Sequence, residues 1–236
     1  VDWQVGVSKE AAPVADETIH STLIAAIEEW NALDPGTVGL ITLMDSDTYE
    51  EMLTGANKIV LKNNSKLFIV AATWPDLAAP NSNGATARKV GYILPDKIRP
   101  HLKGDVSIKS SASQGQKSEL YVNGLLIEGK VTVLTGNLTT LHISQSTIVP
   151  AKGGIVVNSS TSTENNCDLV ISLQRLICGP VATTEYLQKV ALTDCLIDCA
   201  DAVSSVIALE NTCVNLDNCT VFGDVTAQCL NASNSI

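Results

Sequence analysis

Apolar and polar positions alternate over short stretches in the second half of the chain, and one pattern recurs there. Each copy holds two apolar residues two positions apart, then a short polar bend, then an apolar anchor. The complete copies span 120–127, 141–148, 171–178, 190–197 and 214–221, and a partial copy begins at Leu230. Successive side chains of a strand point to opposite faces, so alternation over so few residues predicts short β-strands.

A second feature, Gly-x-Val, follows three of the copies, at residues 129–131, 179–181 and 223–225. Each unit therefore predicts a strand, a bend, a second strand, a glycine-bearing turn and a third strand. The anchors recur every 19–30 residues, which favours a right-handed parallel β-helix whose coils stack about 4.8 Å apart. The anchors are Ile127, Ile148, Cys178, Ile197 and Val221, and the bends are Asn123-Gly124, Ser144-Gln145, Thr193-Asp194, Asp217-Asn218 and Ser233-Asn234.

The first half of the chain begins with a helical pattern. Four apolar residues at helical spacing predict a helix over 16–33, with Asp16 as its N-cap and Asp34-Pro35-Gly36 at its end. Apolar runs at 38–44 and 66–72 predict buried strands. The four apolar helix residues are Ile19, Leu23, Ile27 and Trp30.

These patterns predict one all-β domain with an N-terminal helix. The chain has no initiator Met and stops within a repeat, so we expect it to be part of a longer protein. The expected parts are an N-terminal cap at 1–37, strands of the first coil at 38–72, a lateral loop at 73–118 and regular coils at 119–236.

The opening of the chain resembles that of the pectin-lyase-like β-helix superfamily, where a helix leads to I-x-L, a turn and Y-x-E. The matching segments are TIHSTLIAAIEEW and GLITLMDSDTYEE, within residues 18–51. The repeat architecture extends the resemblance over 120–236. The resemblance implies that the helix covers the open end of the first coil.

Enzymes of that superfamily cleave polysaccharides, and their catalytic motifs are largely missing here. Paired Asp motifs with GHG and RIK do not occur, and Arg175 is the only Arg after residue 118 that could serve a lyase. Tyr49 and Glu51 match the Y-x-E element of pectin-esterase-like enzymes, but the later Asp and Arg-Pro-Trp segments are absent.

We therefore expect no catalytic residue, no bound metal and no cofactor. The predicted function is that of a structural or interaction module, similar in general architecture to bacterial surface or phage-tail-like β-helix proteins. A polysaccharide-active lyase or hydrolase is the alternative.

Charge narrows the choice of partners. A formal net charge of −10 disfavours nucleic-acid binding, and no apolar run approaches the roughly 20 residues that span a bilayer. Residues 88–117 have a positive net charge, unlike the rest of the chain, with seven bases and two acids. This segment either docks an anionic protein partner or subunit, with carbohydrate as another possible ligand, or is neutralised by the acidic coils beside it. The candidate contact residues are Arg88, Lys89, Tyr92, Lys97, Arg99 and His101.

All seven cysteines lie after residue 166, and their odd number disfavours a secreted disulfide framework. We expect free, mostly buried thiols and a reducing environment, with Cys195 and Cys219 in adjacent coils because they occupy the same repeat position. Disulfide bonding and zinc binding are the less favoured alternatives. Another group, Asp45, Asp47, Glu50 and Glu51, fits a turn with a solvated edge better than it fits a Ca²⁺ site or a catalytic pair.

Overall fold

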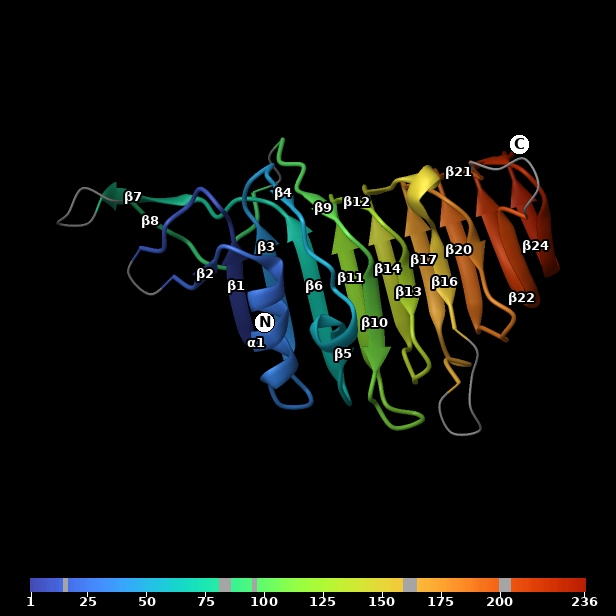
Figure 1. Cartoon of the computed structure of the whole chain (residues 1–236), viewed down its shortest axis with the longest axis horizontal. Helices are drawn as coiled ribbons and strands as arrows, with labels where there is room; N and C mark the ends of the chain where they lie inside the picture. Colours follow the sequence, from blue (N-terminus) through green and yellow to red (C-terminus); the bar gives the residue numbers. More distant parts are fainter. Residues whose placement is uncertain (15–16, 81–85, 95–96, 159–164, 200–204) are drawn as a thin grey trace.

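In the computed structural model, parallel strands stand side by side along the long axis of the molecule (Figure 1). The chain is all-β with one α-helix, which is consistent with a parallel β-helix. The structure describes residues 1–14, 17–80, 86–94, 97–158, 165–199 and 205–236.

Three columns of parallel strands make up the stack, and we name them sheets 1, 2 and 3 in the order in which the chain enters them. Sheet 1 is the longest. Its strands are β1 (Trp3–Val7), β3 (Val38–Leu43), β6 (Ser65–Ala71), β11 (Ser118–Asn123), β14 (Thr140–Ser144), β17 (Val170–Gln174), β20 (Lys189–Thr193) and the second parts of β22 (Ile207–Asp217) and β24 (Val225–Ser233).

Sheet 2 runs alongside it. It comprises β4 (Thr48–Tyr49), β9 (His101–Lys103), β12 (Leu126–Glu128), β15 (Thr147–Ile148), β18 (Ile177–Cys178), β21 (Leu196–Asp198) and β23 (Thr220–Phe222).

Sheet 3 returns the chain to sheet 1, and the two sheets join through β22 and β24, which continue from one to the other. Short 3-10 helices at Gly55–Asn57 and Pro150–Lys152 interrupt the connections. The strands of sheet 3 are β5 (Ile59–Leu61), β10 (Val106–Ser110), β13 (Val131–Val133), β16 (Ile155–Val157), β19 (Val181–Ala182) and the first parts of β22 and β24.

The strand register confirms the repeat seen in the sequence. Ile197 pairs with the anchors Cys178 and Val221 in sheet 2. In sheet 3 the valines of the Gly-x-Val motifs lie in one column along the stack. Ile155 and Ile207 occupy this column in the coils that lack the motif. Inward columns are buried, and each fully buried aliphatic side chain contributes about 1.5–3 kcal/mol. The inward column of sheet 1 includes Leu67, Leu120, Leu141, Ile171, Val190 and Val214.

The predicted bends lie between sheets 1 and 2, and one residue in each has a positive φ. Gly124 adopts this conformation without steric cost, whereas a residue with a Cβ is strained by about 1–2 kcal/mol. The sequence repeat did not identify Arg175 as a bend residue, although its φ is 51°. The other bend residues with positive φ are Gln145, Asp194, Asn218 and Asn234.

The helix α1 spans Leu23–Ala32 and is shorter than the predicted 16–33. Thr22 is its N-cap, with Oγ1 accepting from the Ala25 N–H, so the prediction of Asp16 as N-cap is wrong; Asp16 itself lies outside the described residues. Ile19 belongs instead to β2 (Ile19–His20), which pairs with β1. A β-branched residue that can extend a sheet edge is drawn into that edge rather than into the helix.

The helix packs against β5, the strand at the end of the sheet 3 order. Asn31 donates from Nδ2 to Lys58 O and accepts through Oδ1 from the Val60 N–H. Trp30 Nε1 donates to Val60 O at 2.8 Å. These side chains satisfy backbone groups that a preceding strand would otherwise bind, so this edge is protected from pairing with other chains.

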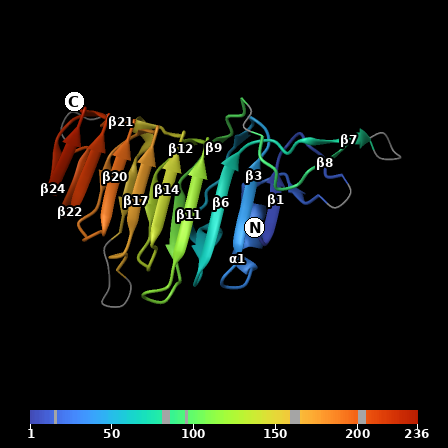
Figure 2. The same ribbon diagram turned by 180° about the vertical axis from the view of Figure 1, so that it is seen from behind.

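The loop is shorter than the predicted 73–118, because β9 and β10, which lie within that range, are regular members of sheets 2 and 3. The described residues outside the sheets here, 72–80, 86–94 and 97–100, are named the extension. It contains an antiparallel hairpin of β7 (Asp76–Pro80) and β8 (Thr86–Arg88), which projects past β1 at one end of the stack (Figures 1 and 2). In the described part of the chain, no helix has the length and apolar character needed to cross a membrane.

Candidate functional site

The extension is fixed to the first strands of sheet 1 by a buried tryptophan. Trp74 is 2% exposed and its Nε1 donates to Thr42 Oγ1 on the outer face of β3. A Cβ on Gly6 of β1 would lie 2.7 Å from Met44 Sδ and 3.2 Å from the Trp74 ring, so a larger residue there would require these side chains to shift. Thr73 and Leu94 form an antiparallel bridge that closes the base of the extension.

Arg88, the first predicted contact residue, is occupied within the protein. Its guanidinium donates to Glu17 Oε2 at 2.7 Å and to Ala12 O, and the side chains of Arg88 and Glu17 are only 15% and 3% exposed. Burial alone would raise the pKa of Glu17, but hydrogen bonds from Arg88 and Val14 outweigh it and hold that pKa below its usual value. Arg88 therefore anchors the extension to the N-terminal segment.

Lys89 and Tyr92 lie together on the surface of the extension. The Lys89 ammonium lies 3.5 Å from the centroid of the Tyr92 ring, a cation–π contact. Tyr92, Ile93 and Leu94 are consecutive and are 56%, 43% and 48% exposed. Three exposed apolar side chains in a row are costly in solvent unless a partner covers them.

The other three predicted contact residues lie closer to sheet 2. Lys97 and Arg99 are exposed on either side of the buried Ile98. The Arg99 guanidinium donates to Ile98 O, and its backbone N–H donates to Ser46 Oγ. His101 is in β9 and is half-buried.

His101 lies between a hydroxyl and a carboxylate, an arrangement that its place in the sequence does not show. Its Nδ1 is 3.2 Å from Thr48 Oγ1, and its Nε2 is 3.3 Å from Glu128 Oε2 without forming a hydrogen bond. Hydroxyl, imidazole and carboxylate in line are the elements of a hydrolytic triad. The strand register brings them together, since Thr48 pairs with His101 in adjacent strands of sheet 2.

Other contacts of these residues oppose catalysis. Glu128 also pairs with Lys152 at 3.5 Å, and the Thr48 N–H already donates to Asp47 Oδ1. That N–H therefore cannot stabilise an oxyanion beside the hydroxyl. We interpret these residues as part of a row of alternating charges on the outer face of sheet 2, which continues through Lys103 and Glu50.

The prediction of a solvated acidic turn is wrong for Asp45 and Glu51, which are 7% and 8% exposed. Asp45 accepts from Ser8 Oγ and Tyr49 Oη at 2.7 and 2.8 Å. Burial alone would raise the pKa of Asp45, but these hydrogen bonds lower it overall. The N-terminal strand β1, which the sequence did not predict, brings Ser8 to this carboxylate and makes its burial tolerable.

Glu51 binds the start of the helix. Its two carboxylate oxygens accept from the N–H groups of Leu23 and Ile24 at 3.0 and 2.6 Å, where the helix dipole favours negative charge. The Tyr49-x-Glu51 element therefore has a structural role here. Among the described residues, no group of three or more His, Cys, Asp or Glu side chains is arranged to hold a metal ion.

A groove with a volume of about 570 Å³ lies on the outer face of sheet 3. Glu210 is the one titratable residue among its described lining residues, so a pair of catalytic carboxylates is not assembled there. The rest of the lining is small and neutral: Thr135, Val156, Val157, Asn158, Ala182, Thr183, Thr184 and Ala208.

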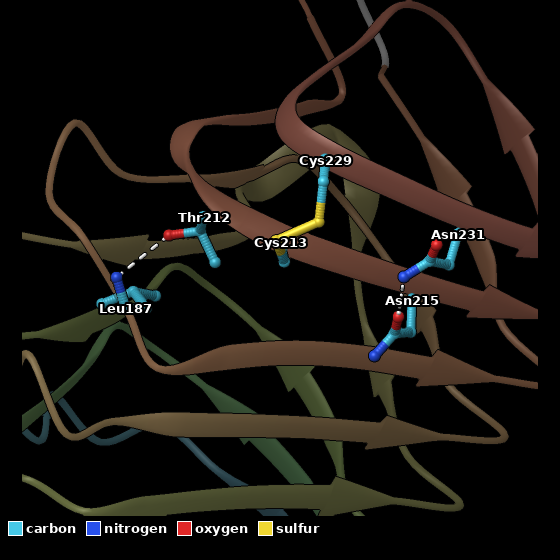
Figure 3. Close-up of a disulfide and its surroundings, with 6 residues drawn as sticks. All are labelled: Leu187, Thr212, Cys213, Asn215, Cys229 and Asn231. Carbon is cyan, nitrogen blue, oxygen red and sulfur yellow. Dashed lines mark hydrogen bonds between the residues drawn. A yellow bond between two sulfur atoms is a disulfide. The ribbon is translucent and has the colours of Figure 1, made fainter.

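The prediction that the cysteines are unpaired is wrong for two of the seven. Cys213 and Cys229 form a disulfide between β22 and β24, with Cα atoms 4.5 Å apart (Figure 3). Each residue immediately precedes the first inward residue of its copy, Val214 or Leu230, so the repeat places them side by side. This shared position can be read from the sequence, and it could have identified the disulfide. Two of the thiols that favoured a reducing environment are therefore bonded.

The prediction for Cys195 and Cys219 is confirmed. They directly precede the register pair of Leu196 and Thr220, and both are buried and unpaired. Burial raises the pKa of Cys195 to about 11, so its thiol is protonated and unreactive at neutral pH.

Hydrogen bonding explains why a thiol suits this position. Cys195 Sγ donates to Thr193 O and Cys219 Sγ donates to Asp217 O, in each case to the carbonyl two residues earlier. Ser146 and Ser235 make the same bond with their hydroxyls. The cysteines are therefore polar turn residues as well as core residues.

Comparison with known proteins gives no match. No family model fits this chain, and no curated protein and no solved structure is significantly similar to it.

Proposed function

We propose that this chain is a non-catalytic structural and interaction module of a larger assembly, similar in kind to bacterial surface or phage-tail-like β-helix proteins. In this proposal the fold is a right-handed parallel β-helix of the pectin-lyase-like type, and α1 caps its first coil. Parallel strand connections are right-handed in nearly all proteins, which supports the handedness. The opening motif within residues 18–51 supports the superfamily.

The observation that carries the proposal is a set of hydrogen bonds between polar side chains of neighbouring coils on the outer face of sheet 1. They bond along the stack: Asn123 Nδ2 donates to Ser144 Oγ, and Asn231 Nδ2 donates to Asn215 Oδ1. Ser233 Oγ donates to an Asp217 carboxylate oxygen at 2.7 Å. Such bonds hold one coil to the next and suit a rod better than a substrate cleft, where polar groups converge on a ligand.

The extension supplies the interaction surface in this proposal. It is held to the coils by Trp74 and Arg88, and it presents the exposed run Tyr92–Leu94. A fixed base with an exposed apolar and aromatic face is the usual construction of a protein-binding patch.

A polysaccharide lyase or hydrolase is the competing function, and it can be tested directly. The purified chain is incubated with polygalacturonate, pectin and neutral polysaccharides while reducing ends and absorbance at 235 nm are followed. We expect no turnover. Turnover that Glu210→Gln abolishes would overturn the proposal, because Glu210 is the titratable residue in the groove of sheet 3.

A further inference from the structure

The exposed face of the extension combines apolar and positive side chains. We name Lys89, Tyr92, Ile93 and Leu94 the basic patch. It lies at the end of the stack where β7 and β8 project (Figure 1). Exposed Lys97 and Arg99 follow it in the chain and add positive charge.

A second exposed apolar surface lies on the outer face of sheet 2, towards the opposite end of the stack. Ile177 pairs with Leu196 in the next strand, and Asp198 pairs with Phe222 in the strand after that. Ile177 and Phe222 are 44% and 57% exposed, while Leu196 and Asp198 are partly exposed. We name these four residues the acidic patch.

The charge around the acidic patch is mainly negative, since its one nearby Arg, the exposed Arg175 two residues before Ile177, lies 3.8 Å from the Asp194 carboxylate. Residues 190–236 contain six acids and no Lys, Arg or His. Asp224 is exposed two residues beyond Phe222. The two patches are therefore alike in apolar character and opposite in charge.

We propose that the basic patch of one copy docks on the acidic patch of a second copy, so that the chain associates head to tail. This inference rests on the proposed function and names the partner as the chain itself. The patches lie at opposite ends of the stack, so one molecule cannot satisfy both within itself (Figure 1). An interface between two different surfaces leaves one of each free, and association continues beyond the dimer unless the chain of copies closes.

The two kinds of side chain have separate roles in this docking. Burial of the apolar residues drives association, and the charges set its orientation and its sensitivity to salt. Exposed charges are screened over about 8 Å at 0.15 M salt. Added salt should therefore weaken the contribution of the charges more than the contribution of apolar burial.

The test uses two variants that each remove one patch. Ile93→Asp alters the basic patch and Phe222→Asp the acidic patch, and both side chains are exposed, so the fold should tolerate them. Sedimentation velocity is measured from micromolar to several hundred micromolar protein. We expect the wild type to form dimers and larger species, and each variant alone to remain a monomer.

The mixture of the two variants is the decisive measurement. Each retains the patch that the other lacks, so an equimolar mixture should form one-to-one dimers and nothing larger. In a second pair, Lys89→Glu should weaken association at least tenfold, and mixing it with Asp198→Lys should restore dimers. Tyr186→Asp is the matched control, because Tyr186 is 54% exposed but lies between β19 and β20, outside both patches.

Three outcomes would overturn the inference: a wild type that stays monomeric throughout, a mixture that behaves like its separate components, or association that survives both variants. Circular dichroism and thermal melts of each variant exclude misfolding as the cause. Flotation with anionic vesicles of phosphatidylserine and phosphatidylcholine tests a lipid partner, and binding by a monomeric wild type would also overturn self-docking. None of these results bears on the polysaccharide assay, so failure of the proposed function is recognised separately.

Discussion

The first coils and the last coils of this stack are stabilised in different ways. At the N-terminal side, a helix, a buried ion pair and an extension cover the strands, and the key contacts join residues far apart in sequence, such as Glu17 and Arg88. In the last coils the same small set of positions repeats, and a disulfide joins neighbouring strands. The first region depends on specific polar partners, whereas the second depends on the repeat itself.

From this difference we expect substitutions in the two regions to have different effects on stability. A unique contact has no substitute, so removing one partner leaves the other buried and unsatisfied. A repeated contact has equivalents in neighbouring coils, so a conservative change can be copied from another coil. Four predictions test this contrast.

The largest expected effect follows from Glu17→Gln. The change leaves the Arg88 guanidinium largely buried without its carboxylate, and we expect a loss of about 3–5 kcal/mol, as for a broken buried ion pair. Hydrogen exchange should show the loss within the extension. Glu50→Gln, which breaks the exposed pair with Lys103, is the matched control and should leave the melting temperature unchanged.

The pH dependence of the same pair has a defined sign. The pKa of Glu17 is lower in the folded protein than its usual value of 4.5, so its contribution is complete above about pH 4.5 and is lost as the pH falls further. The Glu17→Gln variant should lack this part of the acid sensitivity. Equal acid sensitivity in both proteins would show that the ion pair does not hold the extension.

The disulfide should have the next largest effect. Cys213 and Cys229 are 16 residues apart in sequence, and closing a loop of this size stabilises a fold by about 3 kcal/mol. We expect reductant, or Cys213→Ser with Cys229→Ser, to increase hydrogen exchange in β22 and β24 while β1 and β3 are unaffected. The double variant should not respond to reductant. A uniform loss over the whole chain would contradict the separation between the two regions.

The smallest effect tests the repeated position directly. Cys195→Ser should change stability by less than about 1 kcal/mol, because a hydroxyl at Ser146 makes the same bond. Cys195→Ala removes the donor to Thr193 O and leaves a small void, so it should cost more than Cys195→Ser. Urea unfolding of the two variants decides the matter, and an equal cost would mean that the thiol acts as an apolar residue only.

The sequence was most informative where it repeats. Columns such as Leu141, Ile171 and Val190 could be aligned because inward positions must be apolar in every coil. The same alignment places Cys213 beside Cys229, because the two residues share a repeat position. The odd number of cysteines led to the prediction that they are unpaired.

The sequence was least informative where strands are short or contacts are unique. His101–Lys103 has only three residues and was assigned to the loop, because so short a strand has no detectable period. Burial of Asp45 depended on Ser8 and Tyr49, and no local pattern links a carboxylate to a hydroxyl 37 residues away. Of the six predicted contact residues, Arg88 proved to be occupied within the protein, and only the structure showed the exposed run from Tyr92 to Leu94.

The stack of parallel strands, its register and its bends follow from the sequence alone, because a period of two along each strand and a repeat between coils leave few other arrangements. The buried charges, the bonded thiols and the exposed surfaces are known only from the folded structure. These depend on distances between residues far apart in the chain, and such distances follow from packing rather than from local pattern.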